Sequence, residues 1–499
     1  MLNKFLLLII FTFNVHIHLN AQESYQIHFK NELNDYVNEL IETNNGKIIA
    51  VGKQNILDYY KYSSKGKIWQ FSSTFDTLSK VFQFGDTASL FINIEKSENN
   101  SFFIFGSMFI PPLFDKTSVL ALKVNESLEV LNQKVISIDG WDNIEFWYEK
   151  KFFNSYYLFG RVSKGEVYKA CIIQLNNNLE MVKHKIYDDF QASPLTFYWD
   201  CLLTPDSSQF LTLTHGFYNS SNLVVYDTAL NYIYHKPFPF HWDPGTMDID
   251  VSYGGDMTAD WLSDSTFLVG CLNKRVFNNQ TDDDDALGFS EMDTSMSIVP
   301  ITFIGSIDTT EYPAWRTTFD FTTSDSIYFT GTSNMGFGPW PNKPSWIMAG
   351  MLDRNLNQKF IQYYGGDAYY EAVSMKCTSD GGMVIAARRY DYPAQSSEND
   401  AVFLKLNSTG LITGSKEQQT CPNTVFSVFP NPTANYINVT LVVPKADLRM
   451  YDISGVQLLY RQIVKGENLI NIPCFSTGMY IIEIKTPQGE IFTKKIIKK

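Results

Sequence analysis

The stretch that decides the fold is Phe102-Phe103-Ile104-Phe105-Gly106, a run of strand-forming residues that ends in a glycine. The same pattern, a polar turn followed by strand formers and a small residue, occurs seven times along the chain. Its last small residue falls at positions 52, 106, 160, 216, 270, 331 and 387, so that successive copies are 54 to 61 residues apart. Six nearly equal intervals indicate a repeat architecture, because unrelated strands have no reason to be evenly spaced.

A second apolar run follows the small residue and ends in a turn. Examples are residues 120–125, 171–176, 223–227 and 402–407, each of which ends in Asn or Asp. These two residues favour turns because they tolerate a left-handed backbone and bond their own chain. A third strand, such as residues 359–364, then leads to the next copy. About four short strands in each repeat is the pattern of a β-propeller blade.

We therefore predict an all-β protein, with one β-propeller of about seven blades over residues 22–414. Helical periodicity is nowhere sustained, which excludes helical solenoids and α/β folds. An extra strand at residues 25–29 precedes the first repeat, and we expect it to pair into the last blade and cover its open edge. The alternative is a pair of β-sandwiches whose strands are evenly spaced by coincidence. The repeats also resemble the loosely conserved propeller repeats of large exported bacterial proteins, a similarity that implies an architecture and no activity.

The N-terminus has the parts of a secretory signal peptide. Lys4 precedes an apolar run at residues 5–13, and a polar stretch ends at the small residue Ala21. This order is typical of an exported chain, and we predict a signal peptide over residues 1–21. An apolar run this short does not cross a bilayer as a helix, which takes about 20 residues, so we predict no transmembrane segment.

Composition excludes some partners and leaves others open. The formal net charge of -13 and the pI near 5.1 disfavour nucleic acid, because the chain has no basic stripe for phosphates. Aromatic residues make up 15% and charged residues 19%, which suits a packed globular core. The six cysteines are scattered without a C-x-x-C spacing, and we interpret them as buried small hydrophobes, with one or two disulfides left open. They are Cys171, Cys201, Cys271, Cys377, Cys421 and Cys474.

A different pattern begins after a polar linker at residues 415–424. It has an opening Phe-Pro-Asn-Pro motif, an Asp-x-x-Gly turn, a Gly-x-Tyr strand start and a basic end. The residues are Phe429, Pro430, Asn431, Pro432, Asp452, Gly455, Gly478, Tyr480, Lys494 and Lys495. In physical terms the two prolines cannot lie in an interior strand, and the terminal lysines would protect an edge strand.

The order and spacing of these motifs resemble the type A sorting domain of type IX (Por) secretion, over residues 425–499. The resemblance implies a small C-terminal β-sandwich that directs the folded protein to an outer-membrane translocon and is often then removed by a sortase. The translocon and the sortase are thus expected partners. The protein is expected to be secreted or to lie on the outer-membrane surface of a Gram-negative bacterium. An ordinary accessory β-domain, such as a fibronectin-like module, is the alternative.

Candidate site residues are few. Asp282, Asp284 and Asp285 form an acidic cluster in a predicted loop and could hold Ca²⁺, which takes six to eight oxygens, although their spacing fits no EF-hand. A solvated acidic loop is the alternative reading. Trp242 could stack on a sugar, and Trp340, which stands between two prolines, is a candidate for an exposed binding contact. The sequence has neither an H-E-x-x-H nor a G-x-S-x-G motif, so we predict no catalytic residue and no cofactor apart from the possible Ca²⁺.

Two functions remain open at this point. The first is a non-catalytic binding or adhesion propeller that recognises an extracellular glycan or protein, which the lack of a compact catalytic motif favours. The second is an enzyme that degrades extracellular polysaccharide or peptide. Propeller sites gather residues from distant blades, so the sequence leaves this second function open.

Overall fold

The chain divides into two compact units, which consist of Met1–Ile27 with Leu33–Glu417 and of His28–Glu32 with Gln418–Lys499. All described secondary structure is β-strand, and the described ranges hold no helix that could cross a membrane. The computed structural model describes residues 24–30, 33–55, 64–72, 77–97, 100–111, 116–187, 195–216, 221–238, 241–243, 247–250, 257–277, 284–295, 301–306, 309–338, 341–394, 398–412, 426–429, 433, 435–452, 456–473, 475–487 and 491–499. The predicted signal peptide and linker lie outside these ranges.

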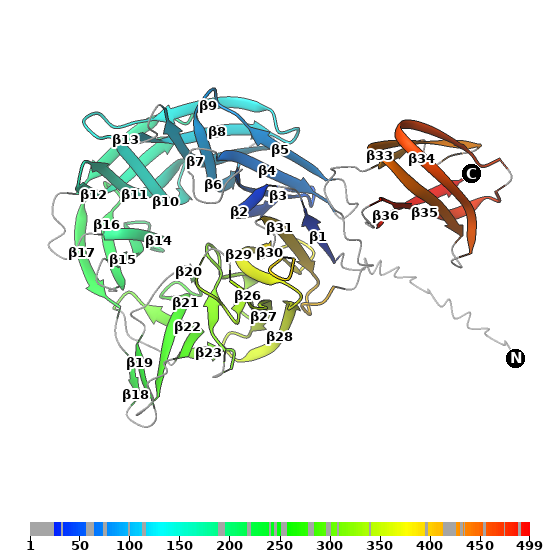
Figure 1. Ribbon diagram of the computed structural model, residues 1–499. Coiled ribbons are helices and arrows are strands. Elements are labelled where there is room, and N and C mark those ends of the chain that lie inside the picture. The colour runs from blue at the N-terminus through cyan, green and yellow to red at the C-terminus, as the bar shows by residue number, and fades with distance from the viewer. Residues whose placement is uncertain are drawn as a thin grey trace, which may run out of the picture. The chain divides into compact units, whose positions relative to one another are not determined.

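The first unit is a ring of blades built from antiparallel strands (Figure 1), and a single parallel bridge between Asn143 and Thr117 joins blades two and three into one eight-stranded sheet. Blade one contains β2 (Asn34–Glu42), β3 (Ile48–Asn55), β4 (Lys65–Phe71) and β5 (Leu78–Phe82). Blade two contains β6 (Ala88–Lys96), β7 (Ser101–Ile110), β8 (Lys116–Asn125) and β9 (Val130–Ile136). Blade three contains β10 (Asn143–Phe152), β11 (Ser155–Lys164), β12 (Val167–Asn176) and β13 (Met181–Ile186). Blade four contains β14 (Leu195–Leu203), β15 (Gln209–Gly216), β16 (Ser221–Asp227) and β17 (Tyr232–Pro237).

The later blades are less regular. Blade five contains β20 (Thr258–Trp261), β21 (Thr266–Phe277), β22 (Asp284–Asp293) and β23 (Thr302–Ile304), and a hairpin of β18 (His241–Asp243) and β19 (Met247–Asp250) extends it. Blade six contains β24 (Glu311–Pro313), β25 (Phe319–Thr323), β26 (Ser326–Ser333), β27 (Trp346–Leu352) and β28 (Gln358–Gly365). Blade seven contains β29 (Tyr369–Cys377), β30 (Met383–Tyr390) and β31 (Asn399–Leu406).

The N-terminal strand closes the ring. Strand β1 (Tyr25–Phe29) is the outermost strand of blade seven, in the order β1-β31-β30-β29. A strand from the start of the chain thus covers the edge that β31 would otherwise expose. The described strands therefore form seven blades, and both the blade number and the closure predicted from the sequence are confirmed.

The repeated glycine has a steric cause. In blades one, two and three the first strand lies at the channel and carries a β-bulge, such as the register shift between Val37 and Glu39 in β2. A Cβ atom on Gly52 would lie 1.9 Å from the carbonyl oxygen of Tyr36, closer than any real contact. Gly106 and Gly160 have the same relation to the bulged strands β6 and β10. The repeat therefore keeps a glycine in these blades because the bulged backbone passes directly over it.

The turn after the third strand also recurs. Asn176 accepts hydrogen bonds through its Oδ1 from the backbone amides of Asn178 (2.9 Å) and Glu180 (3.0 Å). Leu179 has a φ of 64° there, which is uncommon for leucine, and its side chain is fully buried. The predicted Asn and Asp turns are confirmed. The same turn occurs at residues 125–128, 227–230, 353–356 and 407–410, with glycine in place of leucine in the last.

The buried apolar side chains of the propeller pack both within blades and between neighbouring blades. One residue from each of the seven repeated strand runs illustrates this, because all seven are fully buried, namely Val51, Phe105, Phe159, Leu213, Val269, Phe329 and Ile385. Four described cysteines are free thiols, Cys171, Cys201, Cys271 and Cys377. Burial raises the pKa of the Cys171 and Cys271 thiols to about 12, so both behave as unreactive small hydrophobes. Cys421 and Cys474 lie outside the described residues.

The second unit is a small two-layered sheet. Its strands are β32 (Phe426–Phe429), β33 (Tyr436–Asp452), β34 (Gln457–Asn471), β35 (Gly478–Lys485) and β36 (Ile491–Lys498). The register of the β33–β34 pair breaks between Leu441 and Lys445, where the two long strands bend. Side chains from both halves, such as Val439 and Met450, share one buried cluster. This arrangement confirms the predicted β-sandwich.

Candidate functional site

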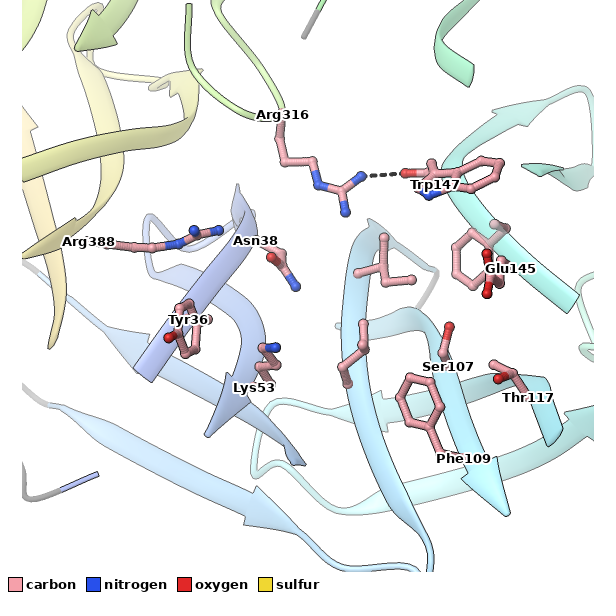
Figure 2. A pocket seen from close by; sticks show the side chains of 13 residues that line it. Tyr36, Asn38, Lys53, Ser107, Phe109, Thr117, Glu145, Trp147, Arg316 and Arg388 are labelled. Carbon is pink, nitrogen blue, oxygen red and sulfur yellow. Dashed lines mark hydrogen bonds between the residues drawn. The ribbon is translucent and has the colours of Figure 1, made fainter. Parts of the chain in front are cut away.

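A cavity of about 440 Å³ opens where the first strands of blades one to three approach one another (Figure 2). These first strands contact their neighbours around the ring and so surround the channel. The cavity is called the mouth pocket below. Its lining consists of Tyr36, Asn38, Lys53, Leu90, Ile92, Ser107, Phe109, Thr117, Glu145, Phe146, Trp147, Arg316 and Arg388.

The strand directions explain why these residues meet. The lining positions are near the start of the first strands β2, β6 and β10, and near the end of the second strands β3, β7 and β30. Neighbouring strands of a blade are antiparallel, so the start of one and the end of the next lie at the same face of the ring. The connections between second and third strands begin at that face in every blade.

Two cations converge on one aromatic ring in the mouth pocket. The Lys53 ammonium lies 4.8 Å from the centre of the Tyr36 ring, and the Arg388 guanidinium lies 5.2 Å from it. Arg388 also donates to Glu371 at 3.1 Å, while its buried Nε has no partner among the described residues. The ring quadrupole of Tyr36 stabilises both charges. Blades one and seven therefore place two positive groups on the same side chain.

Arg316 reaches into the mouth pocket from the opposite side of the ring. It lies in the segment between β24 and β25, and its guanidinium donates a hydrogen bond to the carbonyl oxygen of Trp147 in β10 (Figure 2). Its backbone amide donates to the carbonyl of Val373 at 2.7 Å. One side chain thus joins the blade-six segment to blade three across the channel.

Glu145 is the one carboxylate among the described lining residues. Its Oε2 accepts two hydrogen bonds from Arg161, at 3.0 Å from Nε and 2.7 Å from Nη2. The Arg161 guanidinium lies 4.7 Å from the centre of the Tyr168 ring and 5.2 Å from that of Trp147. This ion pair holds the Glu145 side chain in one orientation.

Further along the first strands, polar contacts join each blade to the next. The contacts include backbone amides, hydroxyls, carboxamides and one lysine, and they run all the way around the channel. In ring order they are Asn38 Nδ2 to Phe91 O (2.6 Å), Asn93 Nδ2 to Glu149 O (3.0 Å), Lys150 Nζ to Asp200 Oδ1 (3.5 Å), Ala259 N to Asp200 Oδ2 (2.8 Å), Thr318 N to Thr258 Oγ1 (2.8 Å), Cys377 N to Asp320 Oδ2 (2.9 Å) and Ser374 Oγ to Glu39 Oε1. We call this set the channel ring.

The channel ring includes carboxylates in unusual environments. Glu149 is 1% exposed, and burial, followed by the nearby charge of Glu95, raises its pKa well above the usual value. Asn93 donates to its Oε2 at 3.0 Å, and its Oε1 has no partner among the described residues. Burial lowers the pKa of Lys150, but Asp200 and other acidic groups outweigh it and the net shift is upward. Glu149 therefore keeps its proton to a higher pH than an ordinary glutamate does, and Lys150 keeps its charge to a higher pH than an ordinary lysine does.

The acidic residues predicted to bind Ca²⁺ do not all lie in a loop. Asp284 and Asp285 begin strand β22, opposite Arg275 and Lys274 of β21. The loop assignment was wrong for these two residues, because their backbone continues the antiparallel ladder of β22 with β21. Within the described ranges no three His, Cys, Asp or Glu side chains gather as metal ligands. Asp282 lies outside those ranges, so the Ca²⁺ site stays a prediction.

The two predicted binding tryptophans are not among the described lining residues. Trp242 lies in the short strand β18, paired with Asp248 of β19. Trp340 falls outside the described residues, in the connection between β26 and β27. Both assignments stay predictions. Sequence reasoning missed Lys53, Arg316 and Arg388, because no motif marks them.

The described sorting-motif residues lie in the strands of the second unit, and several of them are at or near strand ends. Phe429 ends β32, while Gly478 and Tyr480 begin β35. Asp452 ends β33, accepts a hydrogen bond from the Val456 amide at 3.0 Å and pairs with Tyr480 across the sheet. Lys494 and Lys495 lie in β36. Pro430, Asn431, Pro432 and Gly455 lie outside the described residues.

The fold and the mouth pocket define a β-propeller that carries a separate β-sandwich at its C-terminal end. Residues 427–499 match the family described as a secretion system C-terminal sorting domain. The second unit is therefore a type IX sorting domain, and the protein is secreted or lies on the bacterial cell surface.

Comparison with whole proteins gives distant similarities. No curated protein matches the chain. Among solved structures, the NanB sialidase of Streptococcus pneumoniae is 8% identical, with a TM-score of 0.39 over 75% of this chain and 69% of that one. A puromycin hydrolase is 9% identical, with a TM-score of 0.45 over 94% and 58%. PorZ, a surface component of the type IX secretion system of Porphyromonas gingivalis, is 9% identical, with a TM-score of 0.22 over 88% and 69%.

Proposed function

We propose that this protein is an exported, non-catalytic binding module whose mouth pocket holds part of an extracellular ligand. The observation that carries the proposal is the pairing of Glu145 with Arg161, because Glu145 is the one carboxylate among the described lining residues. Arg161 donates two hydrogen bonds to its Oε2, so this oxygen is already engaged by a neighbouring side chain. Hydrolysis of a glycosidic bond usually takes two carboxyl groups that flank the bond. The described lining instead combines aromatic walls with cationic groups, which suits recognition.

Pocket size and composition support the same proposal. A cavity of about 440 Å³ lies within the range of small-molecule sites, which are mostly apolar with a few convergent polar groups. Tyr36, Phe109 and Trp147 supply flat apolar surface, while Asn38 and Ser107 supply amide and hydroxyl groups. A glycan end or a side chain of an extracellular protein has this mixture of surfaces.

The test is a binding and turnover screen of the secreted protein against polysaccharides and peptides. We expect saturable binding without turnover, and Tyr36→Ala should weaken that binding because it removes an aromatic wall. Tyr363→Ala is the matched control, since Tyr363 is an exposed aromatic residue on β28, away from the lining. Turnover of any probe would overturn the non-catalytic assignment and favour the enzyme alternative. If Tyr36→Ala and Tyr363→Ala bind equally well, the ligand does not bind in the mouth pocket.

A further inference from the structure

A row of side chains leads outward from the mouth pocket across blade three. Glu145 and Trp147, which line the pocket, lie on the first strand β10 (Figure 2). Glu145 is paired directly with Arg161 of β11, and Arg161 is paired with Ala170 of β12. Residues opposite each other on antiparallel strands share a face of the sheet, and so do residues two apart on one strand. Tyr168, two residues before Ala170, therefore lies on the same face as Glu145 and Arg161.

The guanidinium of Arg161 joins two aromatic rings of this row. It lies 5.2 Å from the centre of the Trp147 ring and 4.7 Å from that of the Tyr168 ring. The two ring centres are therefore no more than 9.9 Å from the guanidinium carbon in total, and no farther than that from each other. Arg161 also donates two hydrogen bonds to Glu145, and its side chain is only 19% exposed. Arg161 thus fixes the position of the Tyr168 ring relative to the pocket wall.

Tyr168 offers an open aromatic surface at the mouth face. It is 47% exposed, although Arg161 lies against one face of its ring, and its neighbour Val167 is 53% exposed. Both residues begin β12, whose connection to β11 lies at the same face of the ring as the mouth pocket. We call Val167 and Tyr168 the ledge. Single exposed apolar residues are common, but the ledge continues a pocket wall through a fixed contact.

We infer that the mouth pocket and the ledge together bind a glycan chain, with one sugar unit in the pocket and a following unit stacked on Tyr168. This inference rests on the proposed binding function and extends its ligand from a single unit to an oligosaccharide. The open face of the Tyr168 ring packs against the C–H face of a sugar ring. Because Arg161 already holds the Tyr168 side chain, little conformational entropy is lost when a ligand covers it.

The surfaces favour a glycan over a peptide. Tyr36 and Trp147 in the pocket and Tyr168 on the ledge present flat rings in two successive places. Asn38 and Ser107 add amide and hydroxyl groups to the pocket. Each unit of a glycan repeats a flat C–H face with hydroxyl groups around it, which matches this alternation. The first strands have an edge that is open toward the channel and to which a peptide could add, so a peptide is the competing outcome in the test.

The experiment measures calorimetric binding of the secreted full-length protein to sugars of different length. The probes are the monosaccharide and the trisaccharide of four series, built from α-1,4-linked glucose, β-1,4-linked glucose, β-1,4-linked mannose and β-1,4-linked N-acetylglucosamine. Leucine and trileucine represent a peptide. We expect the trisaccharide of at least one series to bind about tenfold tighter than its monosaccharide, because stacking on a second ring contributes about this factor.

Variants connect this gain with length to the ledge. Tyr168→Ala should weaken binding of the trisaccharide about tenfold, to the level of the monosaccharide, and leave the monosaccharide unchanged. Tyr168→Phe keeps the ring and should keep the gain. Tyr363→Ala is the matched control, because Tyr363 is also 47% exposed but lies on the outer strand β28 of blade six. All three substitutions are at exposed side chains, so we expect the variants to fold.

Three results would overturn the inference. They are equal affinity for the monosaccharide and the trisaccharide in every series, an unchanged gain in folded Tyr168→Ala, and tighter binding of trileucine than of every trisaccharide. Absence of binding by every sugar probe would also reject it. If Tyr36→Ala abolishes sugar binding while Tyr168→Ala changes nothing, the proposed function stands and the ledge assignment fails. If Tyr36→Ala leaves both lengths unchanged, the pocket holds no sugar unit and the proposed function itself fails.

Discussion

Ser374 of the last blade donates a hydrogen bond to the carboxylate of Glu39 in the first blade, although 335 residues separate them in the chain. The other oxygen of Glu39 accepts from Thr317 at 3.1 Å. The Leu40 amide donates to the same oxygen as Ser374, at 2.9 Å. The channel ring thus closes at the point where the propeller itself closes, and one carboxylate holds blades one and seven together.

Removal of the Ser374 hydroxyl should destabilise the propeller. Ser374 is fully buried. Ser374→Ala therefore removes a hydrogen-bond donor from the Glu39 carboxylate at a place where water cannot easily take the position of the hydroxyl. We expect the free energy of unfolding to fall by about 1–3 kcal/mol, measured by chemical denaturation. The control is Ser379→Ala, because exposed Ser379 joins the same two blades through Glu42 at 3.0 Å and should cost less than about 0.5 kcal/mol. Equal losses in both variants would contradict the assigned role of burial.

The anchor glycines should reject a side chain. In Gly106→Ala the new Cβ would meet the carbonyl oxygen of Leu90 at 2.1 Å, so the bulged strand β6 must move. We expect a loss of about 1–3 kcal/mol in the free energy of unfolding, read from urea melts. Gly165→Asn is the comparison, because Gly165 has open space around it and a φ of 57° that asparagine tolerates. An unchanged free energy of unfolding in Gly106→Ala would show that the bulge is not the reason for the repeated glycine.

Glu149 should make stability fall as the pH rises. Its pKa is raised in the folded protein, whereas an unfolded chain releases the proton near pH 4.3. Above that pH the folded state binds the extra proton, so the free energy of unfolding decreases with pH until the folded pKa is reached. Glu149→Gln, which is neutral throughout, should remove this part of the slope above about pH 4.3. Glu180→Gln, at an exposed turn, is the control, and an unchanged slope in Glu149→Gln would refute the assignment.

The sorting domain should be needed for export and dispensable for the propeller fold. Deletion of residues 425–499 removes a unit with its own buried core, while β1 and the channel ring remain to close the blades. We expect a folded propeller in the periplasm, detected by cell fractionation and by its far-ultraviolet circular dichroism. Normal amounts of the truncated protein outside the cell would show that another signal directs export. An unfolded product would show that the tail is structural.

The sequence by itself determined the number and order of the blades. Each blade is local in the chain, so its strands and turns appear as a pattern of β-formers, a small anchor such as Gly106 and an Asn or Asp turn such as Asn176. The C-terminal sorting domain could also be predicted from the sequence, because its motifs are short and occur in a fixed order. Even the closing strand at residues 25–29 followed from the need to cover an open edge.

The mouth pocket was decided only by the tertiary structure. Lys53 and Arg388 lie far apart in the chain, and only the closed ring brings both onto the Tyr36 ring. Arg316 meets Trp147 because a side chain crosses the channel, a relation that no local pattern encodes. The bulges that turn polar groups into the channel depend on hydrogen-bond register between strands, which composition does not reveal. Local chain preferences therefore determined the blades, while the long-range closure of the ring determined the chemistry at its centre.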